Sequence, residues 1–247
     1  MDFKKEEKAI SVVIPIWNEI EENIKELYSR LTYVLVGLGR AYEIIFVDNR
    51  SNNEIFNTLF ALHKKDERVK IIRLAKNFGQ RAAFLAGFEY ARGEIIVTMD
   101  SDLQNSPEDL PKFIEKMDAG FQVAFGWRTK RRDPLFTRRI PSFLLNRIIN
   151  IRTGVNLHDW GCSFNAIKKK TAEQLESYGT TARFIKPIAL QITTSIVEIP
   201  VKHCDRKRGK SSYNISSLML MALDSLMHYS TQPTGKYGSL FVVSEIY

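Results

Sequence analysis

The sequence of 247 residues is poor in cysteine and histidine and has no long apolar run. Its two cysteines, Cys162 and Cys204, lie far apart without a pairing pattern, so neither a disulfide framework nor a cysteine-rich zinc site is indicated. None of the four histidines has metal-ligand spacing. A membrane-spanning helix needs roughly 18 to 20 apolar residues, which no run reaches, and the N-terminal run is too short for a signal peptide. We therefore expect a protein of the reducing cytoplasm.

Positive charge is in excess, with a formal net charge of +8. Such a charge favours polyanions: nucleic acid, a phosphorylated small molecule or an anionic membrane surface. The basic residues cluster in two stretches, Trp127–Arg139 and Lys202–Lys210. Each stretch is consistent with a solvated basic loop as well as with an anion site. Because no nucleic-acid-binding motif accompanies them, we expect no nucleic acid partner.

Short apolar runs alternate with helical patterns through the first half of the chain. The strand-like runs lie at 10–16, 42–47, 69–74, 94–99 and 122–126, and Ile20, Ile24, Leu27, Leu31, Val34 and Leu38 recur at helical spacing after the first. Further helices are expected to begin at Ser106, with this serine as the cap, and at about residue 140. The alternation predicts an α/β fold with a largely parallel sheet between helices.

Acidic side chains follow two of the predicted strands. Asp48 and Asp100 come directly after such runs, and ligands of parallel sheets bind outside the carboxyl ends of the strands. Asp100, Asp102 and the amide oxygen of Gln104 suit a hard divalent cation such as Mg²⁺ or Mn²⁺, which prefers oxygen ligands. An Asp-x-Asp pair is also found in ordinary acidic loops, so the pattern alone indicates a candidate metal site and no more.

Five stretches, in order, resemble the successive motifs of family 2 glycosyltransferases. They are VVIPIWNE (12–19), FVDNRSNN (46–53), AKNFGQRAAFLAGFEYARGEIIVTMDSDLQ (75–104), DWGCSFNAIKK (159–169) and RKRGKSSYN (206–214). Within the family they most resemble the polyprenyl-phosphate branch, which includes dolichol-phosphate mannose synthases and bacterial undecaprenyl-phosphate glucosyltransferases. The resemblance runs from about residue 10 to residue 233 and implies the nucleotide-binding α/β sandwich called GT-A. That fold agrees with the alternation of strands and helices.

The resemblance also implies where a nucleotide diphosphate sugar and its cation bind. The expected contacts are Pro15, Asn18, Glu19 and Asp48 in the nucleotide pocket, Asp100 by the ribose and diphosphate, Arg206, Lys210, Ser211 and Tyr213 over the diphosphate, and Asp100, Asp102 and Gln104 around Mg²⁺ or Mn²⁺. Within the pocket, Glu19 would lie near the ribose and Asp48 would face the base.

The implied reaction is an inverting, metal-dependent sugar transfer to a polyprenyl phosphate, with a UDP-sugar favoured over GDP-mannose as donor. The acceptor phosphate would be bound by Arg128, Arg139 and Ser142, because guanidinium groups bind phosphate oxygens bidentately. With a second pKa of about 6, this phosphate is largely ionised near neutral pH. We therefore expect no essential general base, with Asp159 the candidate if one is used. The expected catalytic residues are Asp102, Arg128, Arg139 and Asp159.

The second motif departs from the family pattern. The family usually has Asp-Asp-Gly-Ser followed by another acid, whereas this chain has DNRS at 48–51 and Asn53 in the later position. Asparagine tolerates the left-handed backbone that glycine supplies, but Arg50 does so poorly. These changes could alter base recognition or metal affinity. We still expect activity, because Asp48, Asp100, Asp102 and Gln104 remain.

The C-terminal part is expected to form a separate amphipathic segment over 214–247, after a catalytic domain at 1–213. Apolar residues cover much of a helix from Ile215 to Tyr229. Such a helix could pack in the core or rest on a membrane beside the basic loop, and the sequence leaves both readings open. Peripheral association with the cytoplasmic face of a membrane is the expectation.

Two other functions stay open at this stage. The same fold could transfer a sugar to a hydroxyl group of a polysaccharide or protein, which would need Asp159 as a working base. Alternatively, the altered second motif could mark a catalytically impaired module that binds through its basic loops. A steep salt dependence would accompany nucleic-acid binding by such a module.

Overall fold

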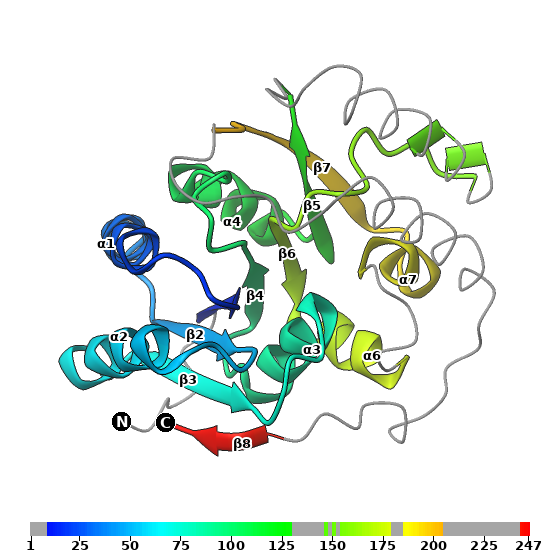
Figure 1. Ribbon diagram of the computed structural model, residues 1–247. Coiled ribbons are helices and arrows are strands. Elements are labelled where there is room, and N and C mark those ends of the chain that lie inside the picture. The colour runs from blue at the N-terminus through cyan, green and yellow to red at the C-terminus, as the bar shows by residue number, and fades with distance from the viewer. Residues whose placement is uncertain (1–8, 130–145, 148–149, 152–153, 179–184, 205–242) are drawn as a thin grey trace.

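The computed structural model describes residues 9–129, 146–147, 150–151, 154–178, 185–204 and 243–247, and within them the strands form one sheet (Figure 1). The strands are β1 (Ile10–Ile16), β2 (Tyr42–Asp48), β3 (Val69–Leu74), β4 (Ile95–Thr98), β5 (Val123–Arg128), β6 (Asn165–Lys168), β7 (Ile196–Val201) and β8 (Val243–Ile246). The helices are α1 (Glu21–Gly37), α2 (Asn53–Lys65), α3 (Gln80–Tyr90), the short 3₁₀ helix η1 (Pro107–Asp109), α4 (Leu110–Asp118), α6 (Lys169–Ser177) and α7 (Ile185–Ile192).

The sheet is mainly parallel, in the order β7-β5-β6-β4-β1-β2-β3-β8. β6 runs antiparallel to β4 and β5, and β8 runs antiparallel to β3. The five strands predicted from the sequence are confirmed within about one residue at either end, apart from β5, which continues to Arg128. Because β1 to β5 all point the same way, their carboxyl ends meet at one edge of the sheet, together with the start of β6.

Helices cover both faces of the sheet, as the alternating pattern predicted (Figure 1). α1, α2 and α4 pack on one face, while α3, α6 and α7 pack on the other. Alternate residues of β1 serve the two cores: Val12 and Ile14 face the first group, and Val13 faces the second. Gly87 lets α3 lie close on β1, since a Cβ atom there would come within 2.1 Å of Val13 Cγ1.

The helix expected to begin at Ser106 is present, but its start differs from the prediction. A 3₁₀ turn, η1, precedes α4, and the Ser106 hydroxyl makes no capping hydrogen bond. It donates instead to the Glu108 carboxylate, which also accepts from Arg30 Nη2 of α1 at 2.7 Å. Arg30 is the main reason that the pKa of Glu108 is lowered to about 2. The serine therefore contributes to a tie between η1 and α1 and does not act as a helix cap.

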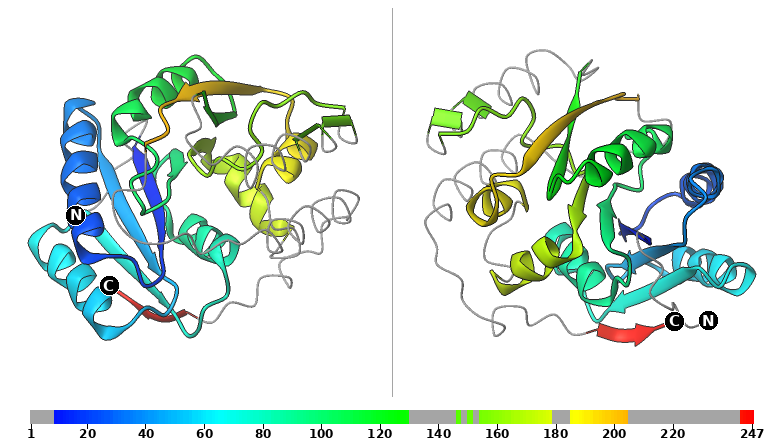
Figure 2. Two further views of the ribbon diagram at one scale, coloured as in Figure 1. Left: turned by 45° about the horizontal axis from the view of Figure 1, so that its top comes forward. Right: turned by 180° about the vertical axis from the view of Figure 1, so that it is seen from behind.

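The end of the chain belongs to the central sheet. β8 pairs with β3, with Ile246 opposite Ile72 and Glu245 opposite Arg73. Residues 214–242 of the segment predicted over 214–247 lie outside the described residues, so the division of the chain at residue 213 stays a prediction. Figure 2 shows β8 and β7 at opposite ends of the sheet. The helix expected at Ile215–Tyr229 lies outside the described residues. Among the helices that are described, none has the length and apolar character needed to cross a membrane.

Candidate active site

The loops after β1 and β2 are tied together at the carboxyl edge of the sheet. The Asn18 N–H donates to Ser51 Oγ at 3.0 Å, and the Asn52 N–H donates to Asn18 Oδ1 at 2.9 Å. Asn18 adopts a positive φ of 47°, and Pro15 lies in β1 opposite Val47. These bonds fix the conformation of the segment that the sequence assigned to the nucleotide pocket.

Asp48 ends β2 and is fully buried. One carboxylate oxygen accepts from the Ser51 N–H at 2.7 Å, and the other lies 3.1 Å from Nε of Arg73. The Arg73 guanidinium in turn lies over the Phe56 ring, 3.9 Å from its centroid. The Asp48 carboxylate therefore fixes the start of the loop after β2. Its predicted position facing the base stays a prediction.

Arg50 occupies the left-handed position of the altered second motif, with φ of 65°. The side chain of Asn49 is buried, and its Oδ1 accepts from the Phe78 N–H at 2.9 Å, which ties this loop to the one after β3. The expected left-handed backbone is thus present at the residue where the family usually has glycine. A neutral amide at position 49 supplies the hydrogen bond acceptor that this contact needs.

We expect Arg50→Gly to raise the free energy of unfolding by about 1 kcal/mol. A left-handed backbone costs a residue with a Cβ atom roughly 1–2 kcal/mol, and the greater freedom of glycine in the unfolded chain removes part of the gain. Urea unfolding measures the change. Arg50→Ala is the matched control, since it removes the guanidinium but keeps the Cβ atom. Equal stabilisation by both variants would assign the effect to charge and contradict the backbone explanation.

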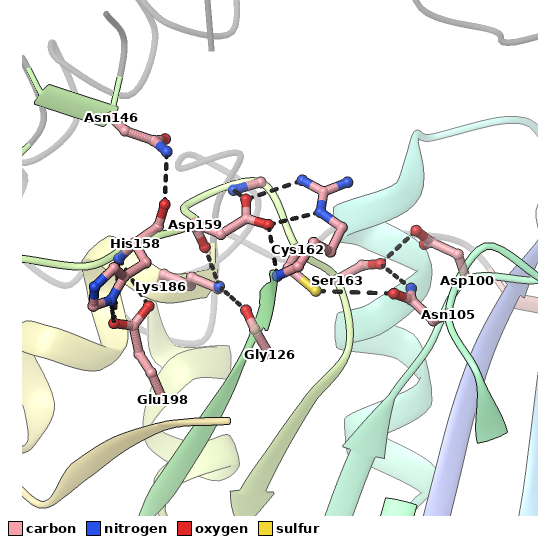
Figure 3. Close-up of polar contacts among 12 residues, drawn as sticks. Asp100, Asn105, Gly126, Asn146, His158, Asp159, Cys162, Ser163, Lys186 and Glu198 are labelled. Carbon is pink, nitrogen blue, oxygen red and sulfur yellow. Dashed lines mark hydrogen bonds and ion pairs between the residues drawn. The ribbon is translucent and has the colours of Figure 1, made fainter. Parts of the chain in front are cut away.

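Asp100 and Asp102 lie just beyond the end of β4. Asp100 Oδ1 accepts from Gln80 Nε2 at 2.5 Å, and Oδ2 accepts from the hydroxyl of Ser163, which lies two residues before β6 in the DWGCSFN motif (Figure 3). Asp102 Oδ1 accepts from the Gln104 N–H at 3.1 Å. Both carboxylates are partly exposed. Residues from three segments therefore orient the acidic pair at the edge where a ligand would bind.

Glu19 lies at the same edge. Its Oε2 accepts from Ser101 Oγ at 3.2 Å, and Ser101 is the residue between the two aspartates. Its Oε1 accepts from the Ile20 N–H at 2.9 Å and from Asn23 Nδ2 at 3.0 Å. The structure thus brings together the first and third motifs, which are some 80 residues apart in the sequence.

The donor atoms of this edge fit a divalent cation. Asp100, Asp102 and Gln104 offer partly exposed carboxylate and amide oxygens, the ligands that Mg²⁺ and Mn²⁺ prefer. Across the described parts of the chain, no cluster of three or more His, Cys, Asp and Glu side chains forms a complete protein metal cage. Two carboxylates with further positions left to water and phosphate oxygens are the arrangement typical of Mg²⁺ at nucleotide sites.

We expect Ser163→Ala to weaken the binding of a Mn²⁺–nucleotide complex by roughly 10-fold or more. Its hydroxyl fixes one oxygen of Asp100, and loss of a residue that orients a metal ligand typically costs 10–100-fold in metal affinity. Calorimetric titration measures the change. Ser163→Thr keeps the hydroxyl and should bind within a few-fold of the parent. Unchanged affinity in Ser163→Ala would show that Gln80 orients Asp100 without help.

Arg128 and Asp159 form a second polar centre at the end of β5. Arg128 Nε and Nη2 lie 2.6 Å and 2.9 Å from the two oxygens of Asp159, which is buried. The Gly161 N–H also donates to Asp159 Oδ1, at 3.1 Å. Because both oxygens accept from the guanidinium, the observed geometry suits an Asp159 that orients Arg128 better than one that takes a proton from a substrate.

The segment from Asp159 to Ser163 connects the two centres (Figure 3). Its first residue binds Arg128 and its last binds Asp100, while Ser163 Oγ also accepts a long hydrogen bond of 3.5 Å from Asn105. The Gln104 carbonyl accepts from the Cys204 N–H at 2.9 Å. The Cys204 backbone therefore lies beside Gln104 of the candidate metal site.

Several predicted residues cannot be placed. Arg139, Ser142, Arg206, Lys210, Ser211 and Tyr213 lie outside the described residues. Sequence reasoning in turn missed Gln80, Ser163 and Arg73, which contact the predicted aspartates. Gln80 and Ser163 stand inside the recognised motifs, but no spacing rule indicates which side chain reaches across the fold to a carboxylate.

The fold and site together define an α/β protein that gathers acidic and basic side chains at the carboxyl edge of its sheet, as proteins that bind phosphate-bearing ligands with a cation do. Residues 11–176 match the family model Glycosyl transferase family 2, and the chain belongs to that family. The predicted family is thereby confirmed.

Similar proteins agree with this assignment. The undecaprenyl-phosphate 4-deoxy-4-formamido-L-arabinose transferase of Pseudomonas aeruginosa strain LESB58 is 36% identical, over 91% of this chain and 66% of its own length. The dodecaprenyl-phosphate galacturonate synthase of Rhizobium johnstonii is also 36% identical, over 94% of this chain and 71% of its own. The chain thus spans about two thirds of the length of these relatives. Their names match the predicted polyprenyl-phosphate branch.

Solved structures share the fold. Glucosyl-3-phosphoglycerate synthase from Mycobacterium tuberculosis, in complex with Mn²⁺, UDP-glucose and phosphoglyceric acid, has a TM-score of 0.64 at 16% identity, covering 90% of this chain and 80% of that one. A mannosyltransferase from Pyrobaculum calidifontis, in complex with GDP-Man and Mn²⁺, has a TM-score of 0.58 at 13% identity, covering 90% and 70%. The predicted GT-A α/β fold is confirmed by these likenesses.

Proposed function

We propose that this chain transfers a sugar from a nucleotide diphosphate sugar to a polyprenyl phosphate, with inversion and with Mg²⁺ or Mn²⁺. The observation that carries the proposal is the Asp159–Ser163 segment, which contacts an arginine suited to phosphate at one end and an aspartate of the candidate metal site at the other. A donor diphosphate and an acceptor phosphate would meet between these two centres. The names of the similar transferases support the acceptor class.

On the donor side, Asp100 and Asp102 would hold the cation, with Gln104 as a third ligand. A bound divalent cation supplies charge neutralisation for the leaving diphosphate. Glu19 and Asn18 would contact the nucleoside, because their loop borders the same edge. Arg206, Lys210, Ser211 and Tyr213 would close over the diphosphate. A uridine donor remains favoured over GDP-mannose.

On the acceptor side, Arg128 would bind the phosphate together with Arg139 and Ser142. Asp159 fixes the plane of the guanidinium group, and a fixed guanidinium binds phosphate oxygens at a lower entropic cost. An ionised phosphate attacks without a general base. The engagement of Asp159 with Arg128 therefore favours a phosphate acceptor over a hydroxyl acceptor. Peripheral binding at the cytoplasmic face of a membrane would bring the protein to such a lipid.

Donor binding tests the proposal first. UDP-sugars and GDP-mannose are titrated by calorimetry with Mn²⁺, with Mg²⁺ and with chelator, on the parent protein and on Asp102→Ala. Binding of one nucleotide that weakens with chelator and with the substitution supports the donor site and names its base. Absence of binding by a folded sample would overturn the proposal in favour of an impaired binding module.

Transfer to a short-chain polyprenyl phosphate tests the acceptor. We expect product with this lipid and none with the corresponding polyprenol. A rate that falls much more with Asp159→Asn than with Arg139→Ala would instead point to a hydroxyl acceptor and a working base.

A further inference from the structure

Lys186 is a buried lysine on α7, next to the site but absent from every recognised motif. Its Nζ donates to the Gly126 carbonyl at 3.1 Å and to the Asp159 carbonyl at 2.5 Å (Figure 3). It also lies 5.0 Å from the centroid of the Phe125 ring. Burial is the main cause that lowers the pKa of Lys186 from its usual value. Burying an ammonium group is costly. Lys186 is nevertheless buried on the same helix as the apolar residues Ile185 and Ile188.

The two carbonyl groups belong to the two members of the arginine–carboxylate pair. Gly126 lies two residues before Arg128 in β5, and Asp159 is the partner of Arg128. A Cβ atom on Gly126 would come within 2.5 Å of the Phe164 carbonyl oxygen and 2.9 Å of Cys162 Sγ. β5 therefore passes tightly against the segment that follows Asp159, and Lys186 ties the two backbones together at that point.

We propose that Lys186 is a positioning residue for acceptor binding: it holds the backbones of β5 and Asp159 so that the Arg128 guanidinium keeps the orientation a phosphate requires. The inference rests on the proposed function. Two backbone amides also donate to the Asp159 carboxylate, the Arg128 N–H to Oδ2 at 3.3 Å and the Gly161 N–H to Oδ1 at 3.1 Å. Without the ammonium group, the Gly126 and Asp159 carbonyl oxygens would each lose a hydrogen-bond donor. β5 and the segment at Asp159 would then be free to shift relative to each other.

The test compares Lys186→Met with Lys186→Gln, which retains two donor hydrogens, and with Ile188→Ala, which damages the same helix without touching the pair. We expect Lys186→Met to lower kcat/KM for polyprenyl phosphate by roughly 100-fold, the typical result of a misplaced reacting group. The loss should lie mainly in the KM for the acceptor. Binding of the Mn²⁺–nucleotide complex should stay within twofold, and Lys186→Gln should restore part of the loss.

Hydrogen exchange at the Gly161 amide provides a readout that does not depend on activity. We expect faster exchange there in Lys186→Met than in Ile188→Ala. A fall in donor affinity accompanied by a rise in acceptor KM, in step with stability and equally in Ile188→Ala, would overturn the positioning role. If the parent protein binds the donor but transfers nothing to polyprenyl phosphate, the proposed function fails, and unchanged Gly161 exchange in Lys186→Met would separately overturn the role of Lys186. If Lys186→Met does not fold, Lys186→Gln is measured alone, and parent-like exchange and acceptor KM would then contradict the proposal.

Discussion

Replacing Asp102 by asparagine is expected to lower the rate of sugar transfer by roughly 1,000-fold at saturating donor. Neutralisation of a leaving diphosphate by a metal ion contributes several kcal/mol, and about 1.4 kcal/mol corresponds to a factor of ten in rate. Asp102 lies at the edge of the sheet beside Asp100, and its Oδ1 accepts a hydrogen bond from the Gln104 N–H at 3.1 Å. Asparagine preserves the size of the side chain but removes the charge that a cation requires.

Initial rates at increasing Mn²⁺ concentration measure this effect. The variant should recover part of its activity at high Mn²⁺, since an amide oxygen is a weaker ligand and not an absent one. Glu115→Gln, which removes an exposed acid from α4, is the matched control and should leave the rate unchanged. Transfer by Asp102→Asn at the parental rate and with parental Mn²⁺ dependence would remove Asp102 from the metal site.

Replacing Arg128 by alanine is expected to lower stability by about 3–5 kcal/mol and to abolish transfer. Breaking a buried ion pair leaves the other charge without compensation, and the Asp159 side chain is 3% exposed against 17% for Arg128. The same substitution removes the guanidinium that would bind the acceptor phosphate. Stability and activity should therefore fall together in this variant.

A double variant separates the two effects. Arg128→Met with Asp159→Asn replaces the pair by neutral side chains of similar volume, leaves no buried charge without its partner and keeps an amide oxygen as acceptor for the Gly161 N–H. We expect urea unfolding close to that of the parent, parental donor binding and no transfer to polyprenyl phosphate. Transfer by this folded double variant would show that neither charge is needed for catalysis and would refute both the arginine and the base assignments.

The sequence predicted the first five strands because each is a short apolar run between helical patterns. It did not predict β6, β7 or β8. β6 is only four residues long and was read as part of a motif, while β8 becomes visible only through its pairing with β3, far away in the chain. A four-residue strand that forms through pairing with a distant strand is too short to show a periodic pattern in the sequence.

Part of the candidate site could likewise be predicted from the sequence, and part could not. Asp100 and Asp102 could be predicted because a residue's position after a strand fixes the edge at which it lies. The contacts of Asp100 with Ser163, and of Lys186 with Asp159, join segments from different parts of the fold. A lysine within the apolar stretch IKPIAL was a detectable anomaly in the sequence. The hydrogen-bond partners of this lysine could be identified only from the fold.

The pairing of β8 with the sheet covers the outer side of β3. Without β8, the outer side of β3 would present unpaired N–H and C=O groups on an apolar strand, and such an edge is a template for pairing with other chains. β8 covers this edge and places Glu245 opposite Arg73, with the charged groups 4.0 Å apart. We therefore expect residues at the far edge of the sheet to influence the concentration at which the protein stays monodisperse.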